Sequence, residues 1–78
     1  MRKPLSELKV GQVGVIVGIT GASPKLKRRI LDMGLVKGTR VKVVRAAPLK
    51  DPIELQTSGY DLSLRRDEAR NIIVEMVE

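Results

Sequence analysis

The chain has 78 residues, and its 15 Lys and Arg against 9 Asp and Glu give a formal net charge of +6. This length predicts one small domain over residues 1–78, and the basic balance favours a partner that carries negative charge. The absence of Cys and His excludes disulfides, zinc fingers, iron–sulfur sites and thiol or imidazole catalysis, so we expect no resident metal and no cofactor.

The N-terminal stretch MRKPLSELKVG contains no continuous apolar segment. We therefore expect no signal peptide and no membrane-inserted segment, which makes the cytoplasm the expected location. Leu5 to Leu8 is interpreted as a short helical turn or an extended entry, followed by a turn around Gly11.

A strand is predicted over Val13 to Ile19, because apolar residues alternate with period two. The side chains expected to share one face are Val13, Val15, Val17 and Ile19, with Gly14, Ile16 and Gly18 on the other. Glycines weaken a strand interior, so these predict a bend, a bulge or a close backbone approach.

A helix of about three turns follows, with Ser23 as its N-cap and Pro24 at its first position. Leu26, Ile30 and Met33 form one apolar stripe at helical spacing. Gly34 is expected to end the helix in the left-handed conformation, with Leu35 folding back on the helix.

The second half predicts short strands separated by turns. Lys37-Gly38 is a tight turn into a strand over Thr39 to Ala46, with Val41, Val43 and Arg45 on one side. A loop over Pro48 to Pro52 precedes a hairpin whose turn is Ser58-Gly59. Its strands are Ile53 to Thr57 and Tyr60 to Arg65, and a polar turn over Asp67 to Arg70 leads to a last strand over Ile72 to Val77. This order predicts a mainly β fold: a small, five-stranded, bent antiparallel barrel with one short helix.

The glycines of RRILDMGLVKGTRVKVV do not predict a phosphate-binding loop. Gly34 and Gly38 are four residues apart and follow a helix, whereas a phosphate loop precedes one. Two pairs of acids, Asp51 with Glu54 and Asp67 with Glu68, lie in turns, where acidic residues commonly form local hydrogen bonds, so we do not interpret them as a catalytic pair. We therefore expect no enzyme activity.

Two surface interpretations stay open. The basic run from Lys25 to Arg45 could bind nucleic acid, although Tyr60 is the only aromatic residue available for stacking on bases. The second concerns Leu31, which lies about 140° around the helix from Leu26. It either packs under the following loop or forms an exposed apolar anchor between Lys27 and Arg28 for an acidic protein partner.

Taken together, five stretches resemble the ferrous iron transport protein A (FeoA) family. They are PLSELKVGQVG over 4–14, RRILDMGL over 28–35, KGTRVKVV over 37–44, APLKDPIEL over 47–55 and GYDLSLRRDEARNI over 59–72. Lys50 stands where the family usually has Gly.

The resemblance implies an SH3-like barrel with an inserted helix and a non-enzymatic role in bacterial ferrous iron uptake. It implies direct contact with FeoB, a membrane permease with a GTP-binding domain. Without His or Cys, we expect an adaptor or regulator that does not carry iron tightly. The residues predicted to contact a partner are Lys27, Arg28, Leu31, Arg40 and Lys42; Ser23, Pro24, Gly34, Gly38 and Gly59 are predicted to be structural. Self-association, nucleic-acid binding and a regulatory domain related to iron-dependent repressors are the alternatives.

Overall fold

The computed structural model describes residues 1–46 and 51–77. Its elements are β1 (Arg2–Pro4), the 3₁₀ helix η1 (Leu5–Glu7), β2 (Val13–Ile19), α1 (Pro24–Asp32), β3 (Arg40–Ala46), β4 (Ile53–Thr57), β5 (Tyr60–Leu64), α2 (Arg66–Ala69) and β6 (Ile72–Met76). The strands pair antiparallel in one six-stranded sheet of order β1-β6-β2-β3-β4-β5. The predicted mainly β antiparallel class with a short helix is confirmed, whereas the predicted Pro48–Lys50 part of the loop lies outside the described residues.

The sixth strand, β1, was not predicted. Its three residues show no alternation of apolar side chains, and they become a strand only by pairing with β6, where Arg2 lies opposite Glu75. Leu5, directly after β1, is fully buried and fixes the chain against the core.

Strand β2 turns Val13 and Val15 outward and Ile16 toward the core. Ile16 is buried, whereas Val13 and Val15 are half-buried on the outer face. The inner face has little room, because a Cβ on Gly14 would lie 2.9 Å from the Val74 side chain of β6. The close backbone approach predicted for the strand glycines therefore occurs at Gly14.

The predicted face of Ile19 was wrong because a bulge changes the alternation within β2. Ile16 pairs with Val74 but Gly18 pairs with Ile73, so Val17 has no single partner across the ladder. Beyond this bulge Ile19 lies opposite the buried Ile72 and packs against the core.

A second bulge changes the alternation within β3. Val43 pairs with Leu55 and Arg45 pairs with Glu54, which leaves Val44 as the extra residue. Arg45 therefore points outward, where its side chain pairs with Glu54 at 3.7 Å, and the prediction that it shares a side with Val41 and Val43 was wrong.

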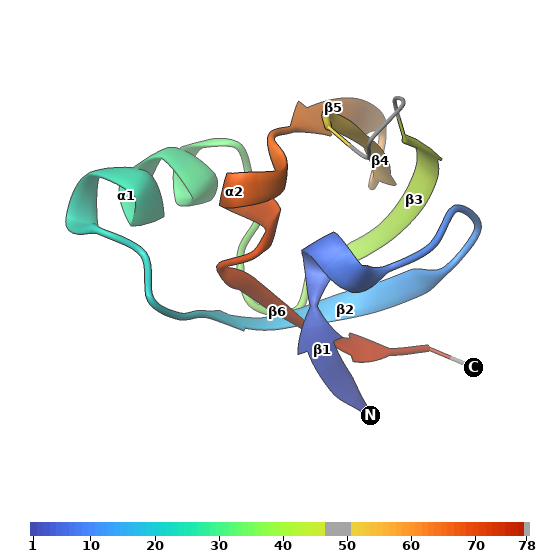
Figure 1. Cartoon of the computed structure of the whole chain (residues 1–78), viewed down its shortest axis with the longest axis horizontal. Coiled ribbons are helices and arrows are strands. Elements are labelled where there is room, and N and C mark those ends of the chain that lie inside the picture. Colours follow the sequence, from blue (N-terminus) through green and yellow to red (C-terminus); the bar gives the residue numbers. More distant parts are fainter. Residues whose placement is uncertain (47–50, 78) are drawn as a thin grey trace.

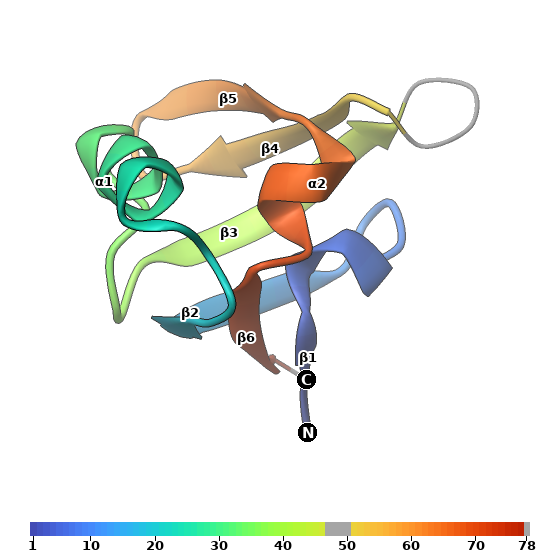
Figure 2. The same cartoon turned by 60° about the vertical axis from the view of Figure 1, so that its left-hand side comes forward.

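The core is aliphatic and joins every layer of the fold. Its fully buried members include Leu5 from η1, Ile30 from α1, Val41 from β3, Leu55 from β4 and Val74 from β6. Both views place α2 between the β5 end and the β6 end of the curled sheet (Figures 1 and 2). The sheet thus wraps one small core, and α1 closes it from the side.

Candidate protein-contact surfaces

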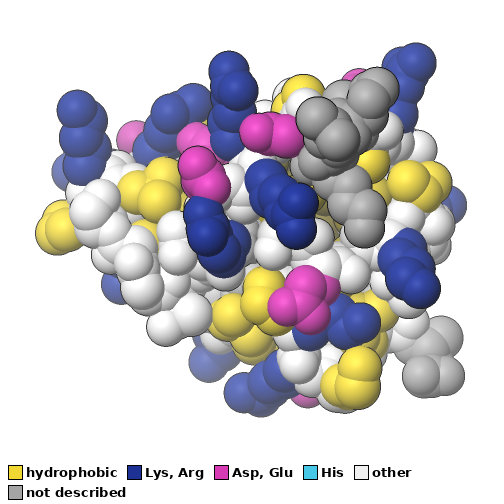
Figure 3. Space-filling model, in the orientation of Figure 1, with side chains coloured by type: hydrophobic (Ala, Val, Ile, Leu, Met, Phe, Trp, Pro, Cys, Tyr) yellow, Lys and Arg dark blue, Asp and Glu magenta, His cyan; other side chains and the backbone are white. Residues whose placement is uncertain are grey.

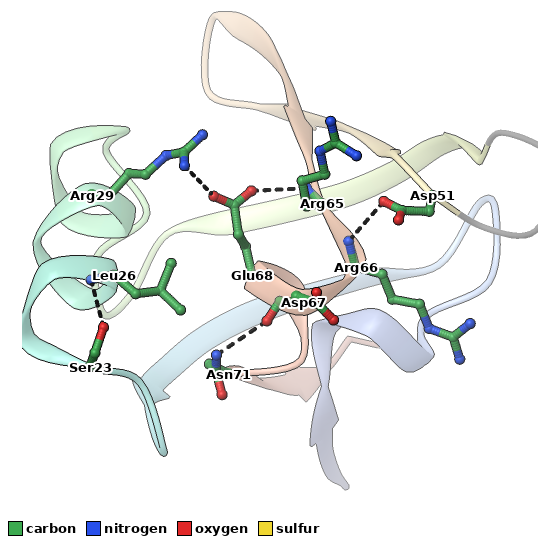
Figure 4. Close-up of polar contacts among 9 residues, drawn as sticks. All are labelled: Ser23, Leu26, Arg29, Asp51, Arg65, Arg66, Asp67, Glu68 and Asn71. Atoms are coloured by element: carbon green, nitrogen blue, oxygen red, sulfur yellow. Dashed lines mark hydrogen bonds and ion pairs between the residues drawn. The ribbon is translucent and has the colours of Figure 1, made fainter.

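Helix α1 has well-formed ends at both termini. The Ser23 hydroxyl accepts a hydrogen bond from the Leu26 N–H at 3.2 Å, which is the predicted N-cap, and Pro24 opens the helix (Figure 4). At the other end Gly34 has φ +84°, and the Leu35 N–H bonds to the Ile30 carbonyl. This is a Schellman ending, so the sequence determines both where α1 begins and where it ends.

Two side-chain contacts that the sequence did not predict hold α1 on the barrel. The buried Glu68 carboxylate of α2 lies 3.2 Å from the Arg29 guanidinium and accepts the Arg65 N–H at 2.9 Å (Figure 4). The Tyr60 hydroxyl of β5 donates to the Met33 carbonyl at 2.8 Å. These contacts, with the buried Ile30, fix the direction in which the other side of α1 faces.

The outer face of α1 presents Leu31 to solvent. Its side chain is 40% exposed, so the interpretation that it packs under the following loop was wrong. Lys27 and Arg28 beside it are also exposed, and the Arg28–Asp32 pair is 4.0 Å long with both side chains mostly in solvent. Such a pair contributes little, which leaves a small apolar spot within a basic surface. Figure 3 shows that Lys and Arg side chains are spread over one face of the molecule, with hydrophobic and acidic side chains among them.

The five predicted contact residues fall into two groups. Arg40 and Lys42 lie on the outer face of β3, opposite Val15 and Val13 of β2. They line a hollow with residues of β4, whereas Arg28 lines a different hollow beside Pro24 and Met33. Within the described residues no ion pair or hydrogen bond joins Lys27, Arg28 or Leu31 to Arg40 or Lys42, so the two groups are treated as separate surfaces. We call the group of Lys27, Arg28 and Leu31 the α1 face.

A cluster of opposite charges joins the edge strand β1 to its neighbour β6. The Met1 amine and the Arg2 guanidinium both contact the Glu75 carboxylate, and these hydrogen bonds hold its pKa below the ordinary value of 4.5. Glu75 is therefore ionised and already paired at neutral pH.

No helix in residues 1–46 and 51–77 has the length and apolar content needed to cross a bilayer.

Comparison with known proteins places the chain beside iron-transport proteins. The family model described as "FeoA domain" matches residues 3–76. A "Fe(2+) transport protein A/Fe(2+) transporter FeoB fusion protein" of Porphyromonas gingivalis is 44% identical over 73 residues, which are 94% of this chain and 8% of that protein. The chain thus spans only a small part of that fusion protein.

Solved structures agree in fold. The NMR structure of a FeoA-like protein from Clostridium acetobutylicum superposes with a TM-score of 0.90 at 39% identity, covering 99% of this chain and 88% of that one. A manganese-dependent transcriptional repressor also gives a TM-score of 0.90, over 97% of this chain and 37% of that chain. Its identity is 22%, so this second likeness shows a shared fold alone.

Proposed function

The chain belongs to the FeoA family of SH3-like, non-enzymatic accessory proteins, and from that premise we propose that it acts in ferrous iron uptake by direct contact with FeoB. We place this contact in the cytoplasm, with residues 1–78 acting as one domain. The chain would then regulate or adapt the transporter without carrying the metal.

The fusion relative is the observation that supports this partnership most strongly. Its name places a Fe(2+) transport protein A and a FeoB transporter in one polypeptide, and this chain is 44% identical to part of it. Covalent joining keeps two modules at a high effective concentration and so favours contact between them. A fusion is therefore expected where the two proteins also associate as separate chains.

The α1 face is the surface that we propose for this contact. Leu31 supplies an exposed apolar anchor, and Lys27 and Arg28 supply positive charge beside it. Interfaces concentrate binding energy in a few central side chains surrounded by polar ones, so an acidic patch with an apolar pocket is the matching partner surface.

Binding to full-length FeoB from the same organism, reconstituted in nanodiscs, tests the proposal. The double substitution Arg28→Glu with Leu31→Glu should weaken binding by about tenfold or more, because it removes the anchor and reverses the charge. The matched control is Lys9→Glu with Val10→Glu, which makes the same charge change at another exposed apolar site (Val10 is 59% exposed).

Three outcomes would contradict the proposal. The wild-type chain could fail to bind FeoB, both double variants could bind as tightly as the wild type, or iron uptake could be unchanged in cells that carry the α1-face variant. A concentration-dependent dimer that the α1-face variant abolishes would assign this face to self-association instead.

A further inference from the structure

Two hollows adjoin on the outer face of the sheet, because Val13 and Arg40 line both of them. Their volumes are about 580 and 550 Å³. The first reaches toward Lys3 of β1 and Met76 of β6, whose strand partners Val74 and Gly14 lie on the inner face. The second stays on the outer face and reaches toward Lys42 of β3 and Gln56 of β4. We call the combined depression the cross-strand groove, since its outer-face part runs across the strands from β6 to β4.

The cross-strand groove is uniformly basic. Lys3, Arg40 and Lys42 line it, and no Asp or Glu among the described residues does. The ion pairs seen in the described part of the chain involve none of these three cations. No described acidic side chain therefore neutralises the positive charge of these three residues.

Two carboxylates share this face of the sheet, and neither neutralises the groove. Val15 of β2 lies between Glu75 of β6 and Arg40 of β3, so two strand spacings separate the two charged residues. The Met1 amine and Arg2 already pair with Glu75. Asp61 lies two strands from Lys42 through Gln56. Two strand spacings are about 10 Å, which exceeds the Debye length of about 8 Å at physiological salt, so the attraction across this distance is largely screened.

The groove also offers apolar surface at its centre. Gly14 and Ile16 take the inner-face positions of β2, so Val13 points outward. Its side chain is half-buried in the groove. Val77 is likewise only partly buried, so a side chain seated between Val13 and Val77 would cover more apolar surface.

We propose that the cross-strand groove binds an extended acidic segment of a partner protein, with carboxylates on Arg40 and Lys42 and one aliphatic side chain against Val13. On the outer face the groove crosses three strand spacings from β6 to β4, about 14 Å along the sheet, which about four extended residues would cover. This contact is separate from the α1 face and does not depend on FeoB being the partner.

The groove favours a protein segment over single-stranded nucleic acid. Base recognition without sequence preference uses aromatic side chains as stacking platforms. The only aromatic residue of the chain, Tyr60, lines neither hollow and has its hydroxyl bonded to the Met33 carbonyl.

A titration of the ¹⁵N-labelled chain, followed by NMR, tests the proposal with a defined probe. The probe is a blocked hexapeptide, Glu-Glu-Leu-Glu-Glu-Glu, and its Leu→Ser version reports on the apolar contact. The largest amide shifts should fall on Val13, Arg40, Lys42 and Gln56, and the serine peptide should bind several-fold more weakly.

Matched charge reversals separate a specific groove from general attraction. Arg40→Glu with Lys42→Glu should weaken binding about tenfold or more, whereas Lys25→Glu with Lys37→Glu, at two exposed residues that line neither hollow, should change it less than about threefold. If the first variant loses its dispersed spectrum, Arg40→Gln with Lys42→Gln takes its place.

Each contrary result would overturn the proposal. These results are shifts centred on α1, equal losses in both charge-reversal variants, equal binding of the leucine and serine peptides, or tighter binding of a six-nucleotide thymidine strand. A failure to bind FeoB with an intact groove titration would overturn only the proposed function.

Discussion

Gly34 satisfies two constraints at one residue. Its φ of +84° is a conformation in which a side chain is strained, and a Cβ built there would fall on the Tyr60 hydroxyl. Gly38 shares the positive φ, at +93°, but a Cβ there would meet nothing within 4 Å. The two glycines therefore separate backbone strain from a steric clash.

We predict that Gly38→Ala lowers the free energy of unfolding by about 1–2 kcal/mol, from backbone strain alone. Gly34→Ala should cost about 1 kcal/mol more, because Tyr60 must leave the Met33 carbonyl and its hydrogen bond is lost. Urea denaturation of both variants measures the difference. Adding Tyr60→Phe should shrink the extra cost, and equal costs at the two glycines would contradict the clash.

Glu75 makes the stability of the fold sensitive to acidic pH. Its pKa is lowered in the folded protein by hydrogen bonds from the Met1 amine and Arg2, so its stabilisation is complete above 4.5 and is lost as pH falls through the folded pKa. We predict that the melting temperature falls less between pH 7 and pH 3 in Glu75→Gln than in the wild type. An identical fall in both proteins would show that this cluster does not couple β1 to pH.

At the scale of elements, local signals predicted the helix and turns, whereas strand faces needed the whole sheet. Ser23, Pro24 and Gly34 define α1 by chemistry within the segment, and Gly59 does the same for the β4–β5 turn with φ +88°. The bulges at Val17 and Val44 depend on partner strands, so strict alternation misplaced Ile19 and Arg45.

The candidate surfaces were only partly predictable for the same reason. Leu31 was placed off the apolar stripe by helical geometry, but its exposure depended on how α1 docks. Glu68 looked like an ordinary turn residue, and its burial follows from the position of α2 between β5 and β6. Arg40 and Lys42 joined the cross-strand groove through strand order, which the sequence did not specify.

Glu68 is the polar link between α1 and α2, and removing it should loosen α1. We predict that Glu68→Ala lowers the free energy of unfolding by about 2 kcal/mol, since the Arg65 N–H loses its acceptor and Arg29 its partner. Amide exchange in α1 should quicken more than in β3. The control is Asp67→Ala, at an exposed residue whose carboxylate pairs with Arg70; equal effects of the two substitutions would contradict the link.

For the whole molecule, the donor set predicts weak affinity for iron. The chain has no His or Cys, and in its described part no group of three or more Asp or Glu side chains could hold a metal ion. We predict that anaerobic titration of the purified chain with ferrous iron shows no stoichiometric binding below micromolar concentration. A one-to-one complex in that range would make the chain a carrier and would sink the adaptor role.

The pairing of β1 with β6 brings Arg2 and Glu75, each near one end of the chain, side by side and away from α1 (Figures 1 and 2). A flexible tether attached at either end would therefore leave from one pole of the molecule, while α1 points elsewhere. Val77 also lines the cross-strand groove, so an acidic tether could fold back and occupy the groove at millimolar local concentration. An acidic tag or linker attached there would then compete in cis with the partner segment that we propose for the groove.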